Sequence, residues 1–338
     1  MSMKRYFTLT ALLFTTAMLQ SNAQDVHFSQ FFEAPLVRNP SLAGIFDGDV
    51  RVQGVYRSQW QSITTPFVTQ SVNAEYKMPV GQSNDFVTMG MQILHDKAGS
   101  TALTTTNVYP ALNYHKALSA DKSTYLSMGF MGGLVQRSFD RSKVTTNHTY
   151  DNGVDGEGNI NPRYAYLDGS AGMSFNSTMG YDEKTTYFLG LAYHHFNKPK
   201  ASFYSNSAVS IQPKWVASGG IKFQVNEMSY FTLEADYTKQ DIASEVMAGA
   251  MFSRKIGYDY DNPLYTVHFG GYMRLNDAFI PVVKLDYHPF SVALSYDINI
   301  STLKTVSQYR GGAELSIAYV GFLDRGNSTK NAVMCPHF

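Results

Sequence analysis

Two short stretches of the chain combine residue types that could bind a metal ion. The first is the adjacent pair His194-His195. Neighbouring side chains on a strand point to opposite faces, so this pair cannot share one ion, and we expect one histidine in the interior and one at the membrane interface. The second, from Asp151 to Glu157, offers oxygen ligands suited to calcium but lacks the terminal bidentate glutamate at EF-hand spacing. We therefore favour a solvated loop over a calcium site there.

Catalytic motifs are absent from the sequence. There is no Gly-x-Ser-x-Gly elbow, no His-Glu-x-x-His and no glycine-rich loop followed by Lys-Ser or Lys-Thr. A single cysteine excludes a disulfide scaffold and a thiolate metal cluster, since each needs several sulfurs. The 27 basic and 27 acidic residues give a formal charge of zero, which argues against nucleic-acid binding. We expect no enzyme activity, no cofactor and no nucleic-acid partner.

The elements that must position any site are strands, because polar and apolar residues alternate along most of the chain. In residues 49–60, for example, Val50, Val52 and Tyr56 stand at even positions, and most odd positions are polar. The same test predicts strands at 49–58, 67–77, 86–95, 104–115, 124–136, 165–176, 185–196, 215–225, 230–239, 244–254, 264–274, 280–288, 290–300 and 311–322. Most are close to the ~9–11 residues of a tilted bilayer crossing. No run of eighteen apolar residues occurs, so we expect no transmembrane helix. The prediction is an all-β protein, a transmembrane antiparallel β-barrel of about fourteen strands.

Connection lengths and side-chain types predict the orientation of this barrel. The longest connections, 137–164 and 197–214, both follow odd-numbered strands, as extracellular loops do when the first strand runs outward. In the ninth strand Phe231 and Leu233 share one face, whereas Glu234 and Asp236 share the other. We assign the apolar face to lipid and the carboxylates to a lumen, where we expect them to lie among polar side chains and water. Tyrosines near strand ends on the apolar face suit an aromatic girdle.

The two ends of the chain have distinct compositions. Residues 1–23 read as a secretory signal peptide, with Lys4 and Arg5 before an apolar stretch and Ser21 to Ala23 as the cleavage site. Gln24 would then begin the mature chain, without the cysteine that a lipid anchor needs. We assign 24–48 to a periplasmic N-terminal segment, 49–322 to an outer-membrane β-barrel and 323–338 to a periplasmic C-terminal tail.

Two alternatives stay open from the residues alone. A soluble secreted β-protein would show the same alternation, with its polar face in water, although a sandwich of this length would normally be divided by a linker, which is not visible. Segment 24–48 is rich in phenylalanine and leucine that must be buried somewhere. It could plug the periplasmic mouth of the barrel or form a partner-binding surface.

Spaced motifs over essentially the whole mature chain resemble the PorP/SprF family of type IX secretion system membrane proteins. Phe28-Ser29-Gln30 is similar to the family's Phe-Ser-Gln, and Asn39 to Gly44 resembles its Asn-Pro-Ala-x-Ala-Gly, with Ser41 in place of alanine. Further matches are Tyr56 to Trp60, His195 to Pro199, Arg274 with Asp277-Ala278, Ser295-Tyr296-Asp297, Gly312 with Glu314, and the Cys335-Pro336-His337-Phe338 ending. His337 departs from the family's arginine.

The resemblance implies a Gram-negative outer-membrane barrel that serves protein secretion and, in some members, the adhesins of gliding motility. Its implied partners are outer-membrane lipid, the C-terminal domains of secreted cargo proteins and periplasmic secretion-ring components. The barrel is too narrow for a folded adhesin, which favours a docking or anchoring role. A passive porin is the alternative, and an outer-membrane hydrolase is the third class. The residues expected to bind partners are Phe28, Ser29, Gln30, Asn39, Pro40, Ala43, Gly44, Cys335, Pro336 and Phe338.

Overall fold

The computed structural model describes most of the chain between residues 25 and 324. It describes residues 25–61, 65–81, 84–119, 123–146, 149, 156, 158–180, 184–204, 209–259, 263–302 and 304–324. The predicted signal peptide (1–23), the predicted mature terminus Gln24 and the end of the tail, with Cys335, Pro336 and Phe338, lie outside these residues. Of the acidic stretch from 151 to 157, the structure describes only Gly156.

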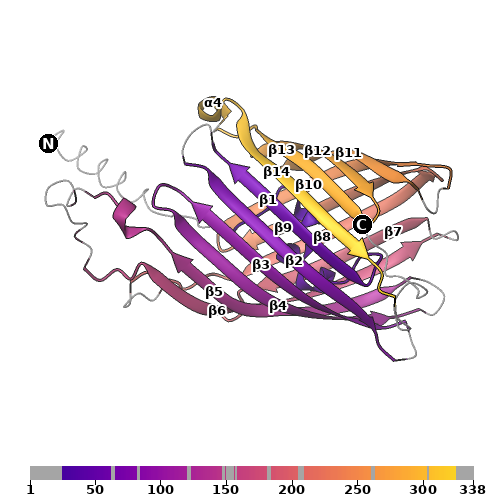
Figure 1. Cartoon of the computed structure of the whole chain (residues 1–338), viewed down its shortest axis with the longest axis horizontal. Coiled ribbons are helices and arrows are strands. Elements are labelled where there is room, and N and C mark those ends of the chain that lie inside the picture. The colour runs from indigo at the N-terminus through magenta and orange to yellow at the C-terminus, as the bar shows by residue number, and fades with distance from the viewer. Residues whose placement is uncertain are drawn as a thin grey trace, which may run out of the picture.

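Fourteen antiparallel strands form one closed barrel in which β1 pairs with β14 (Figure 1). The strands are β1 (Val50–Gln59), β2 (Phe67–Pro79), β3 (Phe86–Ala98), β4 (Leu103–Ala117), β5 (Tyr125–Ser138), β6 (Arg163–Met179), β7 (Thr185–His194), β8 (Lys214–Asn226), β9 (Ser229–Gln240), β10 (Ala243–Ile256), β11 (Tyr265–Arg274), β12 (Ala278–Tyr287), β13 (Phe290–Asn299) and β14 (Arg310–Gly321). Each predicted strand overlaps one of these, so the predicted barrel is confirmed. Closure leaves no unpaired strand edge.

Within the residues that the structure describes, helical structure is limited to short pieces. They are η1 (Phe31–Glu33), α2 (Pro35–Arg38), η2 (Pro40–Leu42), η3 (Arg141–Lys143) and α4 (Lys304–Ser307). No helix in the described part of the chain is both long and apolar enough to cross a membrane.

The period-two pattern of the sequence appears as an apolar outer surface and a polar inner one. In β5, Met128 and Phe130 are 50% and 58% exposed, whereas Tyr125 and Ser127 are fully buried. Ser127 forms a hydrogen bond with His115 of the neighbouring strand β4. The exposed side chains of the wall are therefore mostly those that lipid solvates, and the inner face carries many polar side chains, some of them hydrogen-bonded to one another as Ser127 and His115 are.

The two ends of the barrel differ in the length of their connections. One end, here called the outer end, carries the two long connections 139–162 and 195–213. The other, the inner end, carries shorter turns such as 227–228 and 288–289. This division follows the predicted parity, since long loops are typical of the extracellular side. In Figure 1 the outer end is the one marked by α4, where β1 ends.

Candidate functional site

Residues 25–48, here called the plug, lie inside the barrel. Phe28, Leu36 and Ala43 are 2%, 1% and 0% exposed, and each packs against side chains of the wall. Phe31 and Phe32 pack on the ring of Tyr272 in β11, with ring centroids 5.4 and 5.1 Å away. The segment therefore fills the lumen rather than only the periplasmic mouth that the sequence suggested, and a partner-binding role for it stays a prediction.

The plug runs along the lumen from the outer end to the inner end. At its start, Asp25 contacts Lys214 and Gln240, which are the first residue of β8 and the last of β9. At its end, the Phe46 carbonyl accepts a hydrogen bond from Lys77 near the inner end of β2. The Asp49 N–H then donates to the Gly321 carbonyl and leads into β1. The segment assigned to the periplasm from its sequence therefore occupies the lumen.

The first anchor of the plug is the Phe-Ser-Gln motif. The backbone N–H groups of Ser29 and Gln30 donate to the two carboxylate oxygens of Glu314, at 2.6 and 2.8 Å. The Gln30 side chain donates to the Ser295 hydroxyl and to the Glu314 carbonyl. Glu314 also lies 3.2 Å from the Arg57 guanidinium.

A buried ion-pair network surrounds this anchor. Asp297 lies 3.0 Å from Arg57 and 3.1 Å from Arg274, and Arg274 donates to the Ser29 hydroxyl. These side chains come from β1, β11 and β13, and their exposed fractions are only a few per cent. Buried charges require such pairing, because an isolated ion would lose its hydration without compensation.

The second anchor is Arg38, at the end of α2. Its guanidinium donates to Asp236 at 2.8 Å and to Glu234 at 3.0 Å, and it lies over the rings of Phe31 and Phe188. Glu234 and Asp236 do face the lumen, but the expectation that they lie among polar side chains and water is wrong. Arg38 of the plug pairs with both carboxylates, and the alternation of residues along a single strand cannot reveal such a partner.

The third anchor is the motif from Asn39 to Gly44. Asn39 Oδ1 accepts the Ser41 N–H and so caps the 3₁₀ helix η2, a role that asparagine performs well. Asn113 donates to the carbonyls of Ser41 and Ala43, and the Gly44 N–H donates to Glu75.

Glycines in the wall allow this motif to approach the strands closely. A Cβ added at Gly172 would lie 1.9 Å from Asn39 Oδ1, and one at Gly129 would lie 2.5 Å from the Pro40 carbonyl oxygen. Both distances are far inside van der Waals contact. Glycine at these two wall positions therefore leaves the room in which the plug backbone lies.

The outermost contacts of the plug form an acid-base cluster. Asp25 lies 2.6 Å from His195 and 2.9 Å from Lys214, and Asp168 lies 2.7 Å from the other ring nitrogen of His195. Burial alone would lower the pKa of His195, but hydrogen bonds to Asp168 and Asp25 outweigh it and raise the pKa to about 9. Burial opposes ionisation of Asp25, yet Lys214 and His195 hold its pKa well below the ordinary value. Both groups are charged at neutral pH.

The expectation for the histidine pair is wrong in one respect. His194 ends β7 and faces the lumen, as alternation requires, where it contacts Ser170 and the Arg38 carbonyl. His195 follows the strand with φ +58°, so alternation no longer applies and its ring also points inward. The ring centroids are 6.4 Å apart. Among the described residues, no group of three or more His, Cys, Asp or Glu side chains is placed to hold a metal ion.

The structure brings the seven described members of the predicted partner-binding set together within the lumen. They are buried against the barrel wall, at 0–2% exposure for Phe28, Ser29, Gln30, Asn39 and Ala43, and their role towards partners stays a prediction. Sequence reasoning missed the wall residues that hold them, chiefly Arg57, Arg274 and Glu314. Each had been noticed as a motif fragment, but nothing in the sequence joined the fragments into one site.

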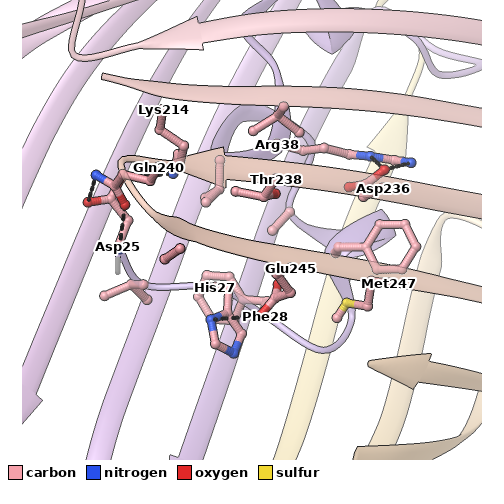
Figure 2. Close-up of a pocket in the computed structure, with 16 residues that line it drawn as sticks. Asp25, His27, Phe28, Arg38, Lys214, Asp236, Thr238, Gln240, Glu245 and Met247 are labelled. Carbon is pink, nitrogen blue, oxygen red and sulfur yellow. Dashed lines mark hydrogen bonds and ion pairs between the residues drawn. The ribbon is translucent and has the colours of Figure 1, made fainter. Parts of the chain in front are cut away.

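Two cavities remain beside the plug. The smaller, of about 70 Å³, lies between the plug and β8 to β10, and Figure 2 shows Asp25, Arg38 and Asp236 around it. The larger, of about 450 Å³, is here called the outer cavity. It is lined by the outer parts of β3 to β6, by residues 209–212 and by Asp25 and Val26 of the plug.

Comparison with known proteins gives one family match. A family model described as type IX secretion system membrane protein PorP/SprF matches residues 20–319. No match was found among curated proteins.

Several solved barrels are similar in fold. The toluene transporter TodX of Pseudomonas putida has a TM-score of 0.47 and 10% identity over 85% of this chain and 92% of its own. The CymD monoaromatic hydrocarbon channel has a TM-score of 0.46 and 8% identity over 89% and 96% of the two chains. The NanC porin has a TM-score of 0.38 and 8% identity over 81% and 100%. Identities this low carry no information on substrate.

Proposed function

Because the chain belongs to the type IX secretion system membrane protein PorP/SprF family, we propose that it docks or anchors secreted surface proteins at the outer membrane. Family and fold together make it an outer-membrane component of the type IX secretion system. The finer proposal is that its cargo is of the adhesin type used in gliding and that the protein acts without catalysis.

One observation carries this proposal, namely the plug and its buried charges. A polypeptide could pass through the lumen only after Arg38 separated from Asp236 and Glu234, and after Ser29 and Gln30 left Glu314. Removing one partner of a buried ion pair typically costs about 3–5 kcal/mol. A lumen filled in this way suits a docking platform better than a conduit. It equally disfavours the alternative of a passive porin, whose lumen holds water.

The two ends of the barrel offer different surfaces for partners. We assign cargo C-terminal domains to the outer end, where the long connections expose side chains such as Tyr204 and Val209. We assign periplasmic ring components to the inner end, where Tyr258 and Leu264 are exposed in the connection between β10 and β11. Exposed apolar side chains at polar rims are typical of interaction sites.

The test compares outer-end and inner-end variants at equal barrel abundance. Tyr204→Ser with Val209→Ser should reduce the amount of partner adhesin retained on the cell surface, whereas Glu227→Gln in an exposed inner turn serves as the matched control. Cell-surface and medium proteomes provide the measurement. Unchanged proteomes in the outer-end variant and in a Tyr258→Ser, Leu264→Ser variant, together with solute uptake by the unsubstituted protein in bilayers, would favour the porin instead.

A further inference from the structure

The outer cavity is lined by charged side chains, two of which form no ion pair with the described residues of the plug or the wall. Four charged groups at its floor and side, namely Asp25, Asp168, His195 and Lys214, neutralise one another in the acid-base cluster. Asp241 lies in the exposed turn between β9 and β10. The remaining charged side chains that line the cavity are Asp96 and Arg137.

Neither Asp96 nor Arg137 has an ion-pair partner among the described residues. Asp96 accepts a hydrogen bond from the Thr69 hydroxyl at 2.7 Å, a neutral partner that cannot replace a cation in direct contact. Arg137 donates to the Tyr164 hydroxyl over a long 3.4 Å, and its Nε has no hydrogen-bond partner. A partly buried carboxylate and guanidinium without a direct ion-pair partner lose hydration that is not fully replaced, so a ligand that paired both would offset that cost.

Strand register fixes the distance between the Cα atoms of the two charged residues. Asp96 of β3 stands opposite Thr105 of β4, and Thr105 stands opposite Arg137 of β5. All three side chains line the cavity. Neighbouring strands lie about 4.8 Å apart, so the Cα atoms of Asp96 and Arg137 are separated by about 10 Å with the short Thr105 between them. The two groups do not meet, but a molecule with a cation at one end and an anion at the other could bridge them.

We propose that the outer cavity is a binding site for a small zwitterion of the amino-acid class. Its ammonium group would bind Asp96 and its carboxylate would bind Arg137, whose guanidinium can donate two parallel N–H bonds to a carboxylate. The unpartnered Asn107 Oδ1 lies on the same face, diagonal to Arg137, and supplies a further acceptor. The cavity volume of about 450 Å³ suits a ligand of this size. This site is independent of the docking role proposed above.

Calorimetric titration of the full chain in detergent micelles tests the proposal with amino acids that differ in the spacing between ammonium and carboxylate groups. The probes are glycine, β-alanine and γ-aminobutyrate, with propylamine and propionate as probes that carry one charge only. We expect binding of at least one amino acid, with a preferred length, and at least about tenfold weaker binding of both single-charge probes. No binding of any amino acid, or equal binding of propylamine or propionate, would overturn the proposal.

Variants separate recognition from a structural effect. Arg137→Gln and Asp96→Asn should each weaken binding of the preferred amino acid about tenfold or more. Arg137→Lys should retain only part of the affinity, because lysine keeps the charge but cannot form the bidentate pair. Arg163→Gln is the matched control, since Arg163 is exposed at the same end of the barrel but does not line this cavity. Heat-modifiable mobility checks that each barrel is folded. Unchanged binding in folded Arg137→Gln and Asp96→Asn proteins would contradict the assignment.

Discussion

The Glu314 carboxylate, on the last strand of the barrel, accepts the backbone N–H of Ser29 at 2.6 Å, although 285 positions separate the two residues in the chain. Strand β14 also closes the barrel by pairing with β1. The same element therefore completes the wall and holds the plug.

Replacing Glu314 with glutamine should loosen the plug without opening the wall. The variant keeps the shape of the side chain but removes the charge that pairs with Arg57 and accepts two N–H groups. A cost of about 3 kcal/mol or more would raise the population of the displaced plug about a hundredfold. Planar-bilayer recordings should show opening events that the unsubstituted protein lacks. The control is Glu227→Gln in an exposed turn, and a closed Glu314→Gln barrel would show that this anchor is dispensable.

Substituting Gly172 with alanine should displace the plug by steric contact. The new Cβ would meet Asn39 Oδ1 at 1.9 Å, and overpacking of this kind typically costs about 1–3 kcal/mol. Limited proteolysis with mass spectrometry should then release fragments from residues 25–48. Gly54→Ala is the matched control, because the nearest atom to its added Cβ lies 3.9 Å away. Equal protease resistance of the two variants would contradict this prediction, because it would mean that the strands shift to accommodate the new methyl group while the plug stays in place.

The strands could be predicted from the sequence because each depends on local information. The alternation of Val50, Val52 and Tyr56 with polar neighbours reports a two-sided wall regardless of which strand lies next to it. The end of β7 shows the limit of this signal. Apolar alternation extended the prediction to residue 196, but the strand ends at His194 because His195 turns with φ +58°.

The contacts of the plug could not be predicted, since they join residues far apart in sequence. One signal was nevertheless present. Arg38 stands in a segment whose phenylalanines and leucines must be buried, and a buried arginine needs carboxylates. Glu234 and Asp236 share a lumen face, so the pairing was available as a hypothesis. The choice among the other carboxylates of the lumen depends on how the plug crosses the barrel, which no local pattern encodes.

The outer attachment of the plug should weaken at high pH. An unfolded histidine has a pKa of about 6.5, and His195 has a folded pKa of about 9, so folding favours its protonated form. This contribution is complete below pH ~6.5 and is lost as pH rises through about 9, with an upper value of about 3 kcal/mol. Asp25 has the opposite pH dependence. Its pKa is lowered in the folded protein, so its contribution to stability is lost when the pH falls below the ordinary range of an aspartate.

Hydrogen exchange of a peptide covering residues 25–38 measures this attachment. Protection in the unsubstituted protein should exceed that of His195→Gln at pH 7, and the difference should vanish above pH 9. Comparison at equal pH removes the intrinsic pH dependence of exchange. His268→Gln is a control, because this histidine pairs with Asp286 away from Asp25. A difference that persisted unchanged at pH 10 would contradict the assigned role of His195.

The orientation of the barrel gives the last prediction. If the long connections are extracellular, a cysteine introduced at Gly158 should react with a membrane-impermeant maleimide on intact cells, and one at Glu227 should react only after permeabilisation. Both positions are exposed, so accessibility reports sidedness rather than burial. Cys335→Ser provides a background without the native thiol. The same orientation places Asp25, the outermost described residue of the plug, towards the cell surface and not the periplasm. Labelling at Glu227 alone on intact cells would reverse the barrel and move the outer cavity, with its two unpaired charges, to the periplasmic side.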